Sequence, residues 1–228
     1  EASEEVLRDL MERRLDAWDL LVVYVDGIQL GDHHVLAAVG VDTDGVKHVL
    51  GVREGASENA EVATALLADL VARGLDPARR RLWVIDGSKA LRKAIDQVFG
   101  QHPVQRCRNH KLRNITGHLP KPEQAQVKSA FRAAMKLEAD EGNRLDLPPR
   151  LRKCLATTNL IDSTHSGVRQ KTGRITHWKN GTMVLRWSAA AFLATEKNYR
   201  RIIGHEHLWI LKAHLDEQEA IAELSMAS

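Results

Sequence analysis

The chain has 228 residues, of which 43% are hydrophobic and 28% charged, values typical of one large or two small globular domains. No apolar run approaches the ~20 residues that a membrane-spanning helix needs, and two cysteines indicate a reduced compartment without a disulfide framework. The acidic first residues do not resemble a secretory signal peptide, so we expect a cytoplasmic protein.

The net charge of +3 conceals an asymmetry along the chain. Residues 103–202 contain 20 Lys/Arg and 7 Asp/Glu, a balance of +13, and the remainder has a balance of −10. Such a concentration of positive charge favours a polyanion as partner. On charge alone, a face of dispersed, solvated charges is an equally good explanation.

A run of six apolar or aromatic residues, 20–25, predicts a strand that is buried on both faces. Residues 1–19 before it have apolar side chains at helical spacing and predict a lead-in helix. Asp26 follows where we expect the strand to end, and Gly27 permits a turn. A carboxylate at the end of a buried strand is costly unless a cap, a salt bridge or a metal ion compensates it.

The remaining periodicities predict two more strands, then strands and helices in alternation, and finally helices alone. The first expected elements are strands at 34–41 and 46–52, a helix at 60–72 capped by Ser57, a strand at 81–86, a helix at 89–99 and a strand at 104–107. The later ones are helices at 109–118, 121–137, 151–155, 161–169, 182–201 and 208–215, with a frayed tail from Glu217.

This order is typical of the ribonuclease-H-like fold, an α/β arrangement in which helices flank a mixed five-stranded sheet. We assign residues 20–120 to the first part of this core and residues 121–150 to an incomplete helical insertion. Residues 151–228 are then C-terminal helices that complete the core. The sequence contains no internal repeat and no low-complexity tract.

In this fold the first and fourth strands are parallel neighbours, so we expect Asp26 and Asp86 to lie side by side near the strand ends. Adjacent carboxylates repel each other unless one is protonated or a cation lies between them. Oxygen ligands favour Mg²⁺ or Mn²⁺, and two ions about 4 Å apart can bind the attacking and leaving oxygens of a phosphodiester. The alternative is that each Asp caps a turn to the glycine after it, but the repeated apolar-Asp-Gly ending favours the metal site.

A third acid must come from a helix near the strand ends, and Asp162 is the best candidate. It lies in the first predicted helical turn after Thr157-Thr-Asn159, whose side chains are good helix caps. The alternative for Asp162 is an acid that only interacts favourably with the helix dipole. Glu196 and Glu206 are rival third acids, and we expect Glu196 to be a solvated residue on a helix face.

Basic residues surround Trp178 and follow Cys107, patterns that suit a nucleic-acid backbone. The residues that we expect to bind DNA are His110, Lys111, Arg113, Arg169, Lys171, Arg174, Lys179 and Arg186. Cys107 and His110 have half the spacing of a zinc site, but no second Cys/His pair stands nearby. A buried cysteine, and a histidine that hydrogen-bonds a backbone or phosphate oxygen, are the favoured interpretation.

Six groups of motifs occur in order over residues 18–215. They are Tyr24-Val-Asp-Gly-Ile28; Lys47-His-Val-Leu-Gly51 with Glu54-Gly-Ala-Ser-Glu-Asn59; Val84-Ile-Asp-Gly-Ser-Lys-Ala-Leu91; Gln105-Arg-Cys-Arg-Asn-His-Lys111 with Asn114; Thr157-Thr-Asn-Leu-Ile-Asp162; and Leu185-Arg-Trp187. With these motifs the chain resembles the catalytic domain of Mutator-type (MULE-like) bacterial insertion-sequence transposases, which are DDE enzymes. The Cys-x-x-His step is the most specific of them.

The resemblance implies that Asp26, Asp86 and Asp162 are catalytic and hold two Mg²⁺ ions, for which Mn²⁺ can substitute. It also implies a homodimer that cleaves and joins double-stranded DNA, at the terminal inverted repeats of an element and at a target. Asp162 departs from the family, which usually has Glu at this position. The family also has a preceding DNA-binding region and a longer insertion, so we expect residues to be missing at Gly142/Asn143.

Two other functions are compatible with the sequence. One is a ribonuclease-H-like nuclease or Holliday-junction resolvase, which stops at hydrolysis. The other is a catalytically degraded, DNA-binding relative of the transposases in which Asp162 is no longer an active acid. Strand transfer of labelled element-end DNA discriminates among them, because only a transposase joins the cleaved end to a second DNA.

Overall fold

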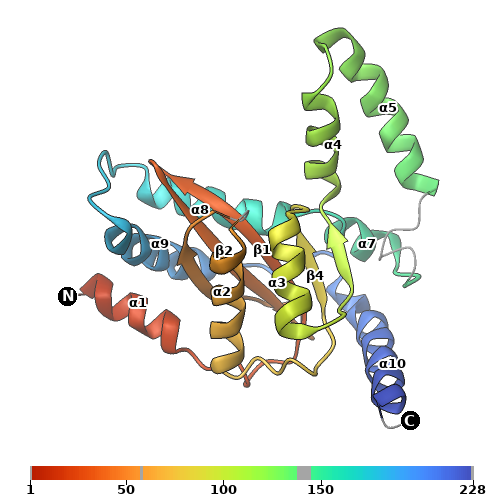
Figure 1. Cartoon of the computed structure of the whole chain (residues 1–228), viewed down its shortest axis with the longest axis horizontal. Helices are drawn as coiled ribbons and strands as arrows, with labels where there is room; N and C mark the ends of the chain where they lie inside the picture. Colours follow the sequence, from red (N-terminus) through yellow and green to blue (C-terminus); the bar gives the residue numbers. More distant parts are fainter. Residues whose placement is uncertain (1, 57–58, 138–144, 227–228) are drawn as a thin grey trace.

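The computed structural model of the chain describes residues 2–56, 59–137 and 145–226 (Figure 1). Its centre is a five-stranded sheet in the order β3-β2-β1-β4-β5. The strands are β1 (Leu20–Leu30), β2 (His33–Asp42), β3 (Lys47–Glu54), β4 (Leu82–Ile85) and β5 (Val104–Arg106). The first three strands are antiparallel, whereas β4 and β5 run parallel to β1. This is the mixed sheet of the ribonuclease-H-like fold, as the sequence predicted.

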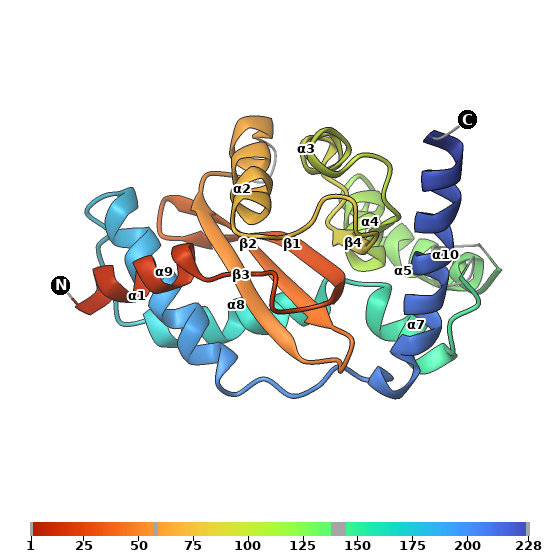
Figure 2. The ribbon, with the colours of Figure 1, turned by 90° about the horizontal axis from the view of Figure 1, so that it is seen from below.

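Helices cover both faces of the sheet. They are α1 (Ala2–Glu12), α2 (Ala60–Ala72), α3 (Lys89–Phe99), α4 (Arg108–Gly117), α5 (Lys121–Leu137), α7 (Pro149–Leu155), α8 (Asn159–Thr172), α9 (Gly181–Glu196) and α10 (Leu208–Met226), with a 3₁₀ turn at His205–His207. Figure 2 shows α2 and α3 on one face and α8 and α9 on the other, with α1 beside α9. The α4 and α5 helices form a hairpin that projects beyond the sheet (Figure 1).

The β1 strand is buried on both faces, as its apolar run predicted. Leu20, Val23 and Val25 pack towards α2 and α3, whereas Val22 and Tyr24 belong to the core on the opposite face. Such a strand has little freedom of register, because a slip by one residue would exchange the side chains of its two faces. The residues of β1 are therefore held at fixed positions in the centre of the molecule.

The prediction that β1 ends before Asp26 is wrong. The strand continues to Leu30, and Asp26 is paired with Ala37 of β2. The cause is unequal pairing on the two sides of β1. The antiparallel neighbour β2 accompanies β1 to its end, whereas pairing with β4 ends at Val25 and Ile85. Asp26 is thus held by backbone pairing on one side and lies beyond the last paired residue of β4 on the other.

Two predicted helix ends also differ from the structure. The helix expected at 182–201 ends at Glu196, because the next segment leaves the helix to pack on the sheet. There Ile202 is buried and donates a backbone hydrogen bond to Gly45 in the β2–β3 turn. The tail expected to fray from Glu217 is helical to Met226, because side chains of the last helix bind the body of the protein.

Asn59 caps α2, accepting hydrogen bonds from the backbone N–H groups of Glu61 and Val62. The expected cap Ser57 and the expected junction at Gly142/Asn143 lie outside the described residues. Within the described part of the chain, we find no helix with the length and apolarity that a membrane span requires.

Candidate active site

The structure brings Asp26 and Asp86 to the same edge of the sheet. Val25 and Ile85 are partners in the parallel β1–β4 ladder; Asp26 is the next residue of β1, and Asp86 is the first residue after β4. Both carboxylates line an open cleft of about 490 Å³. The other residues of this cleft are Gly27, Gln29, His34, Gly87, Ser88, His110, Asn114 and Arg169.

The backbone after β4 explains how Asp86 is held. Its Oδ1 accepts a hydrogen bond of 2.7 Å from the backbone N–H of Ser88. Gly87 between them has a φ of +101°, a conformation that L side chains rarely adopt, and a Cβ there would overlap the Arg106 side chain. Asp86 therefore does cap its own turn, and this cap leaves the carboxylate facing the cleft.

Asp162 lies in the first turn of α8, as predicted. Ligand atoms of Asp26, Asp162 and His165 lie within 4.8 Å of one another. Sequence reasoning missed His165, although it follows Asp162 at the i,i+3 spacing that places two side chains on one helix face. The carboxylate of Asp162 is also 3.4 Å from the hydroxyl of Thr158, one turn earlier.

The electrostatics of this cluster are unusual for a protein interior. Asp26 is 6% exposed, and burial raises its pKa to about 7, with Asp86 and Asp162 adding to the shift and His110 opposing it. Burial also lowers the pKa of His165 to about 3, assisted by Arg169, so this imidazole is neutral near pH 7. The 3.8 Å contact between His165 Nδ1 and Asp26 is therefore not an ion pair.

The donor atoms at this edge fit a divalent cation. Within the described residues, no Lys or Arg forms an ion pair with Asp26 or Asp162, and the buried Nε2 of His165 has no hydrogen-bond partner. Carboxylate oxygens are the preferred ligands of Mg²⁺ and Mn²⁺, and a neutral imidazole can bind Mn²⁺. A cation here would relieve the repulsion that raises the pKa of Asp26.

The Cys107-x-x-His110 motif connects α4 to the helix that carries Asp162. Cys107 is fully buried, and its Sγ lies 3.3 Å from both the backbone nitrogen and the hydroxyl of Thr158. The same hydroxyl is 3.3 Å from Nδ1 of His110. Burial alone would raise the pKa of the Cys107 thiol, but hydrogen bonds with His110 and Thr158 outweigh it and lower the pKa to about 7. The motif therefore fixes the start of α8.

These contacts settle part of the earlier interpretation of the motif. Cys107 is buried, as expected, and His110 contacts the Thr158 hydroxyl, whereas we expected a backbone or phosphate oxygen as its partner. In the described part of the chain, the group of potential metal ligands is Asp26, Asp162 and His165, and it includes neither residue of the motif.

The residues predicted to bind DNA occupy three different environments. His110 and Arg169 line the carboxylate cleft, and Arg113 lies 3.3 Å from His110. Lys111 lies over the ring of Phe131, and Arg186 forms a 2.5 Å ion pair with Glu4 of α1. The remaining three, Lys171, Arg174 and Lys179, are exposed at the end of α8 and in the loop that follows.

Trp178 and Glu196 have structural roles. The indole of Trp178 packs against Gly31 in the β1–β2 turn, where a Cβ would overlap it. Glu196 is not the solvated residue that we expected. It accepts a hydrogen bond of 2.6 Å from the backbone N–H of Val49 and forms a 2.9 Å ion pair with Arg13. The side chain of Glu206 is 44% exposed and lies 4.0 Å from Arg150.

Comparison with known proteins identifies relatives that are all described as transposases. The family "Transposase, Mutator family" matches residues 1–145. The chain is 30% identical over 171 residues to the transposase for insertion sequence element IST2 of Acidithiobacillus ferrooxidans, covering 61% of this chain and 57% of that protein. It is 28% identical over 226 residues to a probable insertion-sequence transposase of Corynebacterium diphtheriae, covering 81% and 65%.

The chain thus spans less than two thirds of the length of these relatives. Among solved structures, the catalytic core domain of BIV integrase is similar at 9% sequence identity and a TM-score of 0.35. That similarity covers 86% of this chain and 97% of the integrase core.

Proposed function

We propose that this chain, which belongs to the Mutator family of transposases, is the catalytic part of a metal-dependent DNA transposase. Its substrates would be the terminal inverted repeats of an insertion sequence and a target DNA, both double-stranded. Asp26, Asp86 and Asp162 would be the catalytic carboxylates and would hold two Mg²⁺ ions, with Mn²⁺ as a substitute. The enzyme would act as a homodimer on bacterial nucleoid DNA in the cytoplasm.

The observation that carries the proposal is the excess of negative charge at one edge of the sheet. Asp26 and Asp86 follow paired residues of two parallel strands, and Asp162 approaches Asp26 from α8. Burial and the two neighbouring acids raise the pKa of Asp26 to about 7. Such a cluster is costly to the folded protein unless it binds a cation, so its retention at a cleft favours a functional role.

Bound Mg²⁺ would activate a water or a 3′-OH as nucleophile and stabilise the oxygen that leaves the phosphorus. The three carboxylates would fix the positions of the reacting groups. Water first breaks the bond between the 3′ oxygen and phosphorus at the element end, which leaves a 3′-OH on the element. That 3′-OH then attacks a target phosphate, so one phosphodiester bond forms as another breaks.

Other residues of the cleft would position the DNA. His110 and Arg169 line the same cleft as Asp26 and Asp86, within reach of a phosphate bound there. Lys171, Arg174 and Lys179 would continue the contact with the backbone along the exposed end of α8 and the loop after it. Thr158, held by Cys107 and His110, would position Asp162.

The experiment is a cleavage and joining assay with labelled element-end DNA, in the presence of Mg²⁺ or Mn²⁺. We expect Asp26→Asn, Asp86→Asn and Asp162→Asn each to lower both steps by about 100-fold or more. Asp162→Glu restores the usual family residue and should retain activity. Asp216→Asn, a change of the same chemistry on α10, is the matched control and should leave the rates within about twofold.

Three results would contradict the proposal. Metal-dependent cleavage without joined products would indicate a nuclease or resolvase. DNA binding with neither step, unchanged by Asp26→Asn, would indicate a non-catalytic relative. Equal activity of the Asp162→Asn variant and the wild type would remove Asp162 from the site, even if the other two acids proved essential.

A further inference from the structure

A second charged surface lies along α7, separate from the carboxylate cleft. Two open pockets of about 450 and 480 Å³ adjoin there and share Lys153 and Thr157. The first pocket lies at the face of α7 that carries Arg150 and Cys154, and the second at the face that carries Arg152. We call their cationic lining the α7 basic surface; its members are Lys47, Arg108, Arg132, Arg150, Arg152, Lys153 and Arg201.

Among the described residues, the cations Arg150, Lys153 and Arg201 of the α7 basic surface have little compensation for their charge. No described Asp or Glu lines either pocket. Arg150 lies 4.0 Å from the carboxylate of Glu206, but its side chain is 76% exposed, so this pair is weak. In the described part of the chain, Lys153 and Arg201 form no ion pair with an acid.

Lys47 is the most constrained of these cations. It is half-buried at the start of β3, and its Nζ lies 4.6 Å from the ring centre of Tyr199. Burial lowers its pKa, and a nearby anion would counteract this effect. A half-buried lysine in a cationic pocket is therefore well placed to bind an anionic ligand.

The surface is adjacent to the carboxylate cleft. Thr157 and Asn159 line one of its pockets, and Asp162 follows within one turn of α8. Asn109 lines the other pocket and donates a 2.8 Å hydrogen bond to Asn159. The next residue, His110, lines the carboxylate cleft itself. Figure 1 shows α7 beside the base of α4, on the side of the sheet away from α1.

We propose that the α7 basic surface binds the phosphodiester backbone of double-stranded DNA that continues from the carboxylate cleft, an inference that rests on the proposed function. A duplex is favoured over a small anion because the cations come from several elements and line two open pockets. Arginine and lysine side chains spread in this way contact successive phosphates and release their counterions. None of the seven residues belongs to the set that sequence reasoning assigned to DNA.

The test compares two variants of equal charge. Arg150→Gln/Arg201→Gln removes two exposed cations from the α7 basic surface, one of which has an acidic neighbour, Glu206. Arg8→Gln/Arg14→Gln removes two exposed cations at and after α1, one of which has an acidic neighbour, Asp16. Binding of a fluorescent element-end duplex by the full chain is measured by anisotropy in EDTA, over a range of salt concentrations.

We expect the Arg150/Arg201 variant to bind roughly tenfold more weakly and to have a log–log salt slope about 2 units shallower, because each lost phosphate contact removes about 0.9. The Arg8/Arg14 control should leave the affinity and the salt slope unchanged, apart from the small general effect of two lost positive charges. Unchanged binding in the first variant, or equal losses in both, would overturn the proposal. Thermal unfolding by circular dichroism confirms that both variants are folded.

Two further arms make the result specific. A polyglutamate peptide that competes as effectively as duplex DNA would also overturn the proposal, because the surface would then bind any polyanion. Since EDTA removes divalent cations, binding is measured without chemistry. We expect Asp26→Asn to bind DNA with the wild-type salt slope, whereas the Arg150/Arg201 variant has a shallower slope. That result would support DNA binding by the α7 basic surface even if the cleavage and joining assay gave no product.

Discussion

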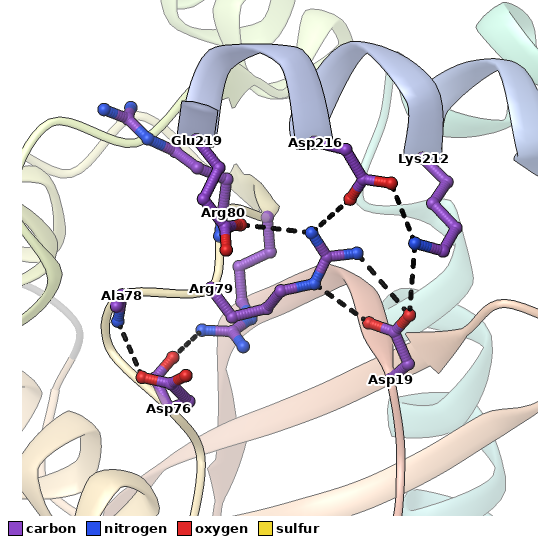
Figure 3. A network of polar contacts seen from close by, with 9 residues as sticks. Asp19, Asp76, Ala78, Arg79, Arg80, Lys212, Asp216 and Glu219 are labelled. Carbon is purple, nitrogen blue, oxygen red and sulfur yellow. Dashed lines mark hydrogen bonds and ion pairs between the residues drawn. The ribbon is translucent and has the colours of Figure 1, made fainter. Parts of the chain in front are cut away.

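Two clusters of acids lie along β1, one just before its first residue and one past its middle, and their charges are compensated differently. At the start of the strand, Arg79 forms ion pairs with Asp19, Asp216 and Glu219 at 3.1, 2.5 and 3.1 Å (Figure 3). Lys212 adds contacts with Asp216 at 2.8 Å and with Asp19 at 3.7 Å. Further along the same strand, Asp26 has two acids and a neutral histidine as neighbours.

This difference in compensation separates a cluster that stabilises the fold from one that is open to a ligand. Burial opposes the charge of Arg79, but hydrogen bonds with its three acids outweigh this and raise its pKa above the ordinary value. That cluster is compensated by the chain itself and attaches α10 to the start of β1. At Asp26, by contrast, no described Lys or Arg forms an ion pair with the carboxylate, and His110 opposes the rise in its pKa only in part, so this carboxylate is available to a ligand.

The largest expected effect on stability concerns the imidazole of His102. This side chain is buried and uncharged, and it lies beside Arg80 and Arg81. Burial, assisted by these two arginines, lowers its pKa from 6.5 to about 4. The unfolded chain therefore binds more protons between pH 6.5 and 4, so stability present above pH 6.5 is lost as the pH falls through this window. The shift corresponds to about 3 kcal/mol.

Replacing His102 with Asn, whose Oδ1 can accept the hydrogen bond from Trp83 Nε1, should remove this loss. The difference in free energy of unfolding between wild type and variant, measured with urea at pH 7 and pH 4, is expected to change by about 3 kcal/mol in favour of the variant. His165 is present in both proteins, so its own titration cancels. A constant difference would show that His102 is not held neutral.

Arg79→Met tests the compensated cluster. The substitution leaves Asp19, Asp216 and Glu219 without their shared partner, and we expect the free energy of unfolding to fall by about 2 kcal/mol. The matched control is Arg92→Met, which breaks an exposed i,i+4 pair with Asp96 and should cost about 0.5 kcal/mol or less. Equal costs in urea denaturation would mean that the Arg79 network does not attach α10.

Asp26→Asn tests the uncompensated cluster, where the expected sign is reversed. Without divalent metal at pH 7.5, an uncharged amide relieves repulsion in a buried site and should raise the free energy of unfolding by about 1 kcal/mol. Mg²⁺ should then stabilise the wild type but not the variant, because only the wild type binds it. A variant less stable than the wild type in EDTA would place Asp26 among the structural acids.

Most of the fold could be predicted from local patterns. The buried run of β1, the helix from Lys89 to Phe99 with its Ser88 cap and the order of strands and helices all follow from periodicity and capping residues. The strand and helix ends were less predictable, because they depend on neighbours. The β1 strand continues beyond Asp26 because β2 pairs with this part of β1. The α9 helix ends at Glu196 because Ile202 packs on the sheet.

The sequence indicated where the three candidate acids lie along the chain, but not what surrounds them. Asp26, Asp86 and Asp162 were proposed from apolar-Asp-Gly endings and a helix start, and the structure places them at one edge of the sheet. The i,i+3 spacing places His165 on the same face of α8 as Asp162, but no local signal indicated that His165 would lie against Asp26. The contacts of Thr158 with Cys107 and His110 likewise had no local signal. These contacts depend on how α8 crosses β1, which the sequence of α8 does not encode.

The sequence by itself determined where this protein has strands, helices and acids, because hydrophobic periodicity and capping act over a few residues. The tertiary structure decided which acids are compensated. Arg79 reaches Asp216 across 137 residues, and Val49 binds Glu196 across 147. Such partners are chosen by the packing of whole elements. Glu196 and Asp162 are both acids on helices, yet Glu196 binds the backbone of Val49, while Asp162 lies beside Asp26 and His165.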